Sequence, residues 1–144
     1  MRIEELDTPA LIVDLDGLED NLDRYQRYFD QHGIGLRPHI KTHKCVAIAH
    51  MQMRRGAIGI TCQKLGEAEV MAEAGIEDIL VTTNIIGAAR SGRLAALQRR
   101  ISLKICADNP VTLDAYAKAG RDAERPIRVL IECDTGRKRA GVET

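Results

Sequence analysis

The chain has no tryptophan, few aromatic residues of any kind and no excess charge of either sign. Aromatic residues make up 3% of its 144 residues, and 21 basic side chains balance 21 acidic ones. Single-stranded nucleic acids bind on exposed aromatic rings, and a nucleic-acid interface of any kind needs a surplus of basic residues. The composition therefore favours a small-molecule ligand and argues against nucleic acid as a partner.

Several motifs are also absent. The four cysteines, at positions 45, 62, 106 and 133, form no C-x-x-C pair, so a zinc knuckle or a thioredoxin motif is excluded. Cys62, Cys106 and Cys133 lie in apolar runs, which predicts small buried hydrophobic residues. No apolar run has the length of a membrane span, and the acidic first seven residues do not resemble a leader peptide. We therefore expect a cytoplasmic protein with no membrane partner.

Strand and helix patterns alternate along the chain. A helix is predicted over residues 18–32, with Asp16 as its N-cap and Gly33 after its end. Five strands then alternate with four helices, which predicts a parallel sheet with right-handed crossovers. The predicted strands are residues 36–41, 57–62, 78–82, 102–107 and 127–134, and the helices between them are residues 45–55, 65–74, 88–99 and 110–119.

The placement of polar residues favours a barrel over a doubly wound sheet. Polar residues follow every predicted strand, at the carboxyl ends where both folds bind ligands. Along residues 127–134 apolar side chains alternate with mostly charged ones, whereas a doubly wound sheet is apolar on both faces. No G-x-G-x-x-G or G-x-x-x-x-G-K-[ST] loop is present. We predict an α/β fold, a (β/α) TIM-type barrel that is incomplete because eight units take about 250 residues.

The most informative stretch is residues 37–44, Arg-Pro-His-Ile-Lys-Thr-His-Lys. On a strand, Arg37, His39, Lys41 and His43 would share one face, a cationic row suited to an anionic cofactor. Neighbouring cations would also favour the neutral, nucleophilic form of the Lys41 amine. Two other interpretations remain open: a solvated edge strand, or a metal held by the two histidines without a clear third ligand.

A second motif is the segment 134–141, Asp-Thr-Gly-Arg-Lys-Arg-Ala-Gly. It is typical of a charged loop that opens a helix, and equally of an anion-binding turn, because its glycines frame two arginines. Glu132 precedes Asp134 by two residues and shares its strand face. Its carboxylate is therefore a candidate partner for an arginine.

With Thr8-Pro9-Ala10 and these two motifs in order, the chain resembles the fold-type III pyridoxal-phosphate enzymes. It is most similar to the D-threonine aldolase and D-serine dehydratase group, which is related to the alanine racemase N-terminal barrel. The resemblance implies an imine between Lys41 and pyridoxal 5'-phosphate (PLP), with Arg139 near the phenolic oxygen of the cofactor. Glu132 then stands where racemases carry a modified lysine. His39 and His43 would polarise or position the substrate, and Arg37 is a further candidate for cofactor binding.

The resemblance also implies a reaction. It is the retro-aldol cleavage of a β-hydroxy D-amino acid, most typically D-threonine, to glycine and an aldehyde. D-serine dehydratase and 3-hydroxy-D-aspartate aldolase activity are alternatives, and a non-catalytic PLP-binding protein or an inactive truncated fragment is an alternative of another class.

Family members use a divalent metal, Mn or Zn, whose ligands lie in a carboxy-terminal β domain, and they form homodimers. Residues 1–144 match only the amino-terminal part of the barrel, about five of its eight units. We therefore expect no metal ligands in this chain, and no activity from it alone.

Overall fold

The computed structural model describes residues 2–143. A short 3-10 helix, η1, is followed by α1 and α2, and from there strands and helices alternate. The elements are η1 Ile3–Glu5, α1 Leu15–Gln31, α2 Val46–Arg54, β1 Ile60–Cys62, α3 Leu65–Glu73, β2 Asp78–Val81, α4 Ala88–Arg100, β3 Ser102–Ala107, α5 Pro110–Asp122, β4 Arg128–Ile131, β5 Cys133–Asp134 and β6 Val142–Glu143. No helix among the described residues is long and apolar enough to cross a bilayer.

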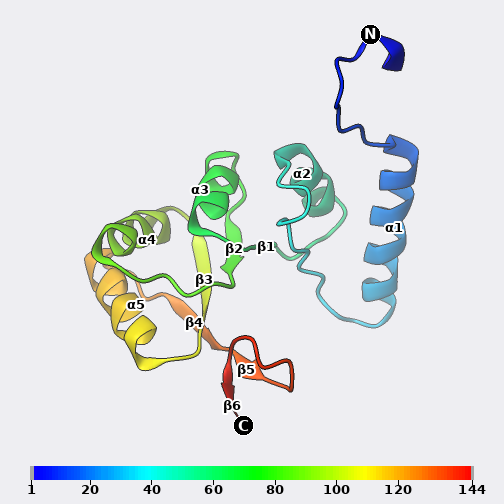
Figure 1. Cartoon of the computed structure of the whole chain (residues 1–144). Coiled ribbons are helices and arrows are strands. Elements are labelled where there is room, and N and C mark those ends of the chain that lie inside the picture. The colour runs from blue at the N-terminus through cyan, green and yellow to red at the C-terminus, as the bar shows by residue number, and fades with distance from the viewer. Residues whose placement is uncertain (1, 144) are drawn as a thin grey trace.

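The four main strands form one parallel sheet in the order β1-β2-β3-β4. An isolated parallel bridge between His39 and Thr61 adds the preceding segment beside β1. The order follows the chain without reversal, as in the wall of a (β/α) barrel, and helices α2 to α5 succeed one another along the outside of the strands (Figure 1). The predicted fold class, an incomplete barrel, is confirmed. We call this sheet the barrel wall.

The alternation of apolar and polar residues determines which face of the barrel wall is buried. In β3, Leu103, Ile105 and Ala107 are buried, whereas Lys104 and the other intervening residues are half-buried. β2 follows the same rule, with Ile79 and Val81 fully buried. The buried set forms one core between the strands and the outer helices, so the opposite face carries the polar residues.

Two helix boundaries differ from the predicted ones. α1 begins at Leu15, because the Asp14 carboxylate, and not that of Asp16, accepts the Gly17 N–H at 3.0 Å and caps the helix. α5 continues through Gly120 to Asp122. Its start is as predicted, since Asn109 Oδ1 accepts the Thr112 N–H at 3.1 Å and Pro110 occupies the first turn.

The last predicted strand, residues 127–134, is divided in two. β4 ends at Ile131, and β5 turns away to pair with β6. All four residues of β4 are exposed, and Cys133 is exposed as well, so its predicted burial is wrong. The physical reason is that β4 is an edge strand with β3 on one side only.

Two hollows lie at the two ends of the barrel wall. One, of about 630 Å³, lies between α5 and the segment leading into β4, and is lined by Tyr116, Ile127 and Val129 among others. The other, of about 440 Å³, lies between α1 and residues 36–42, with Leu22 and Pro38 among its lining. Figure 1 places α1 beyond α2 at one end of the row of helices and α4 and α5 at the other, with β5 and β6 below the strands.

An ion-pair cluster lies on the polar face, at the amino-terminal end of the strands. The Asp78 carboxylate contacts Arg37 Nη1 at 2.6 Å and Lys104 Nζ at 2.6 Å. Arg37 also donates to the carbonyls of Ile58 and Ile60. Gly59, at φ +143°, is required beneath it, because a Cβ there would collide with the guanidinium and lie 2.6 Å from the Asp78 carbonyl oxygen. Arg37 is therefore committed to linking three adjacent segments of the barrel wall.

The charge of Asp78 stabilises this cluster. Partial burial alone would raise the pKa of the Asp78 carboxyl, but the Lys104 and Arg37 hydrogen bonds outweigh it and the pKa falls below its ordinary value of 3.8. A carboxyl whose pKa is lowered by folding stabilises the fold above that ordinary value, and the contribution is lost as the pH falls through the lowered pKa.

We predict that Asp78→Asn lowers the free energy of unfolding of the full-length gene product containing this chain by about 2 kcal/mol at neutral pH, because two half-buried cations lose their partner. Urea unfolding at several pH values measures this. The gap between variant and parent should begin to narrow near pH 3.8 and close only as the pH falls through the lowered pKa of Asp78. The control is Glu69→Gln, which breaks an exposed pair with Arg93 and should cost less than about 0.5 kcal/mol. Equal losses from both variants at neutral pH would contradict the prediction.

Candidate functional site

The segment carrying Lys41 is a turn and not a strand. Extended structure ends at His39, and Ile40 is fully buried, with its N–H donating to Thr61 at 2.9 Å. The chain then folds back, so that the Lys44 N–H donates to the Ile40 carbonyl at 2.8 Å. We call residues 40–43 the Lys41 turn. The predicted single face of Arg37, His39, Lys41 and His43 is therefore wrong beyond His39, because Ile40 is held in the core and the backbone turns directly after it.

Lys41 is exposed at the carboxyl-terminal end of the barrel wall, where ligands bind in this class of fold. Among the described residues, no hydrogen bond or ion pair engages its Nζ. Its backbone N–H donates to His39 Nδ1 at 3.3 Å. Burial and the neighbouring Lys41 charge lower the pKa of His39 below 6.5. His39 is consequently neutral at pH 7 and does not extend a row of cations.

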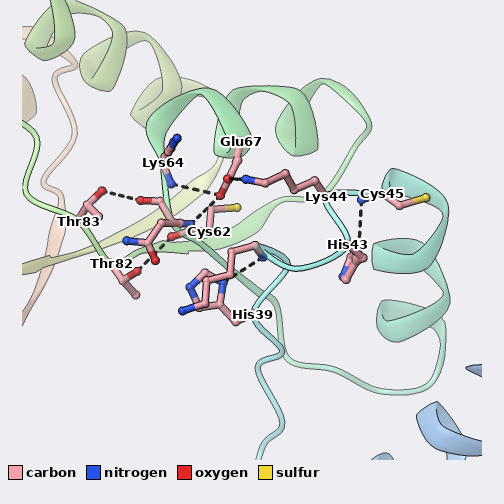
Figure 2. Close-up of polar contacts among 11 residues, drawn as sticks. His39, His43, Lys44, Cys45, Cys62, Lys64, Glu67, Thr82 and Thr83 are labelled. Carbon is pink, nitrogen blue, oxygen red and sulfur yellow. Dashed lines mark hydrogen bonds and ion pairs between the residues drawn. The ribbon is translucent and has the colours of Figure 1, made fainter. Parts of the chain in front are cut away.

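His43 faces a different neighbourhood from Lys41. Its Nδ1 accepts the Cys45 N–H at 3.0 Å, at the start of α2, and Figure 2 shows it there, apart from His39. Burial lowers the pKa of His43, and the Gln52 side chain of α2 partly opposes that shift. The structure thus brings His39 and Lys41 together, and connects His43 to α2.

Glu67 joins the site although its sequence context gave no such indication. Its Oε2 accepts the N–H groups of Gln63 and Lys64, at 2.8 and 3.2 Å, and so caps α3, while Oε1 pairs with Lys44 Nζ (Figure 2). The usual signature of such a cap begins with Ser or Thr, and here the position is Lys64. Only the fold reveals that the carboxylate also reaches Lys44.

Cys62, the last residue of β1, is held as a thiol. Burial and the Glu67 charge raise the pKa of Cys62 to about 12. Its predicted role as a small buried apolar residue is confirmed.

The motif of residues 134–141 folds into a compact loop between β5 and β6, which we call the motif loop. Asp134 Oδ1 accepts the Gly136 N–H at 2.8 Å, and the Val142 N–H donates to the Glu132 carbonyl at 2.8 Å. Backbone N–H groups, first that of Gly136, lower the pKa of Asp134. The predicted alternative of a helix opening here is not found.

Arg139 is exposed on the motif loop and Glu132 is half-buried at its base. No ion pair joins these two described residues. Neither residue lies against Arg37, whose guanidinium is bound at the opposite end of the strands.

Asp108 connects the motif loop to the rest of the carboxyl-terminal rim. Its Oδ1 accepts from Asn84 Nδ2 and Asn109 Nδ2, both at 2.7 Å, and its Oδ2 accepts the Gly141 N–H at 3.1 Å. These hydrogen bonds, led by that from Asn109, lower the pKa of Asp108. The segments that follow β2, β3 and β5 are thus held by one carboxylate.

This arrangement, an exposed amine on a turn at the carboxyl end of a parallel barrel wall, agrees with what comparison with known proteins finds. Residues 13–144 match the family model described as alanine racemase, N-terminal domain. The chain belongs to this family.

The chain is also similar to two D-threonine aldolases and to a D-threo-3-hydroxyaspartate dehydratase. The chain is 41% identical over 140 residues to a D-threonine aldolase of Arthrobacter sp., covering 97% of this chain and 37% of that protein. It is 39% identical to a D-threo-3-hydroxyaspartate dehydratase of Delftia sp., covering 95% of this chain and 36% of that protein. The crystal structure of a D-threonine aldolase from Filomicrobium marinum superposes with a TM-score of 0.95 at 42% identity, covering 98% of this chain and 38% of that chain.

The chain therefore spans little more than a third of the length of these family members. Among residues 2–143, no group of three or more His, Cys, Asp or Glu side chains is placed to hold a metal ion.

We predict that Gly141→Ala disorders the motif loop of this family member. Gly141 has φ +102°, and a Cβ there would lie 2.5 Å from the Asp134 nitrogen, so the loop would have to open. Limited trypsin digestion of the full-length gene product measures this, because Arg137, Lys138 and Arg139 lie in the loop. Gly136→Ala is the matched control, since Gly136 also has a positive φ but no atom within 4 Å of its Cβ position. Cleavage at equal rates in both variants would contradict the prediction.

Proposed function

We propose that the full-length gene product containing this chain is a PLP-dependent lyase that acts on a β-hydroxy D-amino acid, with Lys41 as the residue that binds the cofactor covalently. The observation that supports this most is the exposed, unpaired Lys41 amine at the carboxyl end of the barrel wall, in a chain 41% identical to a D-threonine aldolase. The proposal is made for the whole protein, because the relatives are more than twice as long as this chain.

The residues present suit PLP. A primary amine without a competing ion pair is what the cofactor's aldehyde requires, whereas nearby Lys44 is engaged by Glu67. Arg139, exposed on the motif loop, would contact the phenolic oxygen, and Glu132 at the base of that loop would hold the arginine. When bound, PLP accepts the electrons of the bond that breaks at the substrate Cα.

The two histidines have distinct parts in this proposal. His39 orients the Lys41 backbone through its Nδ1 and, as a neutral imidazole beside the amine, would contact the substrate without adding charge. His43 fixes the junction between the Lys41 turn and α2. Arg37 is left out of cofactor binding, because Asp78 and backbone carbonyls already satisfy its guanidinium.

Retro-aldol cleavage is the first candidate reaction. Loss of the β-hydroxyl proton, rupture of the Cα–Cβ bond and return of a proton to Cα convert D-threonine to glycine and acetaldehyde. The aldolase names of the Arthrobacter and Filomicrobium proteins favour it. Elimination of the β-hydroxyl, as in a D-serine or hydroxyaspartate dehydratase, is the second candidate, favoured by the name of the Delftia relative.

Cleavage of 3-hydroxy-D-aspartate is a variant of the first reaction. A divalent metal such as Mn or Zn would assist at the β-hydroxyl, from ligands outside this chain, and the whole protein would act as a homodimer in the cytoplasm.

The first test is covalent. We expect PLP added to the full-length gene product to give a visible absorption band, and borohydride reduction followed by peptide mapping to place the label on Lys41. Lys41→Ala should abolish both signals, because the amine that captures the aldehyde is gone. Lys64→Ala, which removes another lysine from the same rim, should retain them. A label on any residue other than Lys41 would refute the assignment.

The second test is catalytic. With PLP and manganese present, we expect glycine and aldehyde from D-threonine, and no turnover of L-threonine or by Lys41→Ala. Ammonia release from D-serine or from D-threo-3-hydroxyaspartate would identify a dehydratase instead. A protein that is labelled at Lys41 yet acts on none of these substrates would be a non-catalytic PLP-binding protein.

A further inference from the structure

We propose that Glu67 is a positioning residue for Lys41: by holding both ends of the Lys41 turn, its carboxylate fixes the direction in which the amine meets the cofactor. This inference rests on the proposed function, because it assumes that Lys41 binds PLP. It adds a residue on another element, α3, that does not itself touch the cofactor.

At the carboxyl-terminal end of the turn, Glu67 acts through Lys44. Lys44 has φ +48°, a left-handed conformation that is strained for a non-glycine residue and persists only where its surroundings hold it. The ion pair between Lys44 Nζ and Glu67 Oε1 supplies such a restraint (Figure 2). The Glu67 side chain is 10% exposed and that of Lys44 54% exposed, so the acid is the fixed partner.

At the amino-terminal end, Glu67 acts through Gln63. The Gln63 N–H donates to Glu67 Oε2 at 2.8 Å, and the Gln63 side chain lies close enough to His39 to oppose the fall in the pKa of that imidazole. His39 in turn accepts the Lys41 N–H. The chain of contacts from Glu67 therefore reaches the residues on both sides of Lys41.

A carboxylate is needed because it serves three donors at once. Partial burial would raise the pKa of Glu67, but the hydrogen bond from Lys44 and those from two backbone N–H groups outweigh it and lower that pKa, so the group is ionised at neutral pH. A glutamine amide keeps one accepting oxygen for the cap of α3. The amide cannot form the ion pair with Lys44. Glu67→Gln therefore removes the link between the Lys41 turn and α3 while it largely retains the N-terminal cap of α3.

The same helix offers a matched control. Glu69 lies two residues further along α3 and pairs with Arg93 of α4, with side chains 28% and 51% exposed. Among residues 2–143, no hydrogen bond or ion pair connects these two side chains to the Lys41 turn. Glu69→Gln therefore removes an equivalent charge pair from α3 without reaching Lys41.

The experiment uses the full-length gene product with PLP as the probe. We expect Glu67→Gln and Lys44→Met each to weaken PLP binding about three- to tenfold, the factor of one partly buried ion pair, and to reduce the circular dichroism of the bound cofactor's visible band. The double variant should be no weaker than either single variant, because both remove one interaction. Lys44→Arg, which retains the charge, should restore the signals, and Glu69→Gln should leave them unchanged.

If PLP affinity and circular dichroism are unchanged in both Glu67→Gln and Lys44→Met, the inference is overturned. The proposed function would still stand in that case if borohydride labels Lys41. Equal effects from Glu69→Gln would also overturn it, since the loss would then be general to α3. Absence of label on Lys41 in the parent protein would refute the proposed function and this inference with it. Because the Lys44 side chain is largely exposed, we expect Lys44→Met to fold. This variant therefore tests the inference even if Glu67→Gln does not fold.

Discussion

Burial of every second residue of the central strands β2 and β3 beneath the outer helices is the constraint on which the rest of this structure depends. It directs Leu103, Ile105 and Ala107 of β3 into the core and leaves Lys104 on the polar face. The same alternation brings Asp78 of β2 within reach of Lys104 and Arg37, and places His39 beside Thr61. Once Ile40 is buried, the chain can turn and present Lys41 to solvent at the carboxyl-terminal rim.

Three carboxylates then connect segments that the strands alone would leave separate. Asp78 joins neighbouring segments at the amino-terminal end of the barrel wall. Its ion pairs there stabilise the fold. Glu67 and Asp108 act at the other end, where Glu67 links α3 to the Lys41 turn and Asp108 links the motif loop to the loops beside it. The division matches the general separation, in barrels, of a stabilising face from a functional one.

The sequence predicted the fold well because the fold depends on periodic patterns. The strand at residues 102–107, the Asn109 cap and the parallel alternation are all local signals, and each agrees with the structure. The site was predicted less well because it depends on where single residues leave those patterns. An apolar Ile40 between polar residues fits burial, but nothing in the run Pro-His-Ile-Lys-Thr-His-Lys indicates that the backbone turns after Ile40 or that Lys44 adopts a left-handed conformation. A strand over the whole run was therefore the natural expectation. The contacts of Glu67 with Lys44 and of Asp108 with Gly141 span 23 and 33 positions, beyond any local pattern.

The exposed edge of β4 acts as a template for any strand that extends the barrel wall. Its free backbone groups would accept a neighbour, and Val129 and Ile131 continue the helix-facing rows of Ile105 and Ala107. A strand shifted by one residue would turn its apolar side chains toward the interior, where charged groups lie. The side-chain pattern of this one edge thus dictates the phase of any strand that pairs with it, and makes a wrongly phased addition energetically unfavourable.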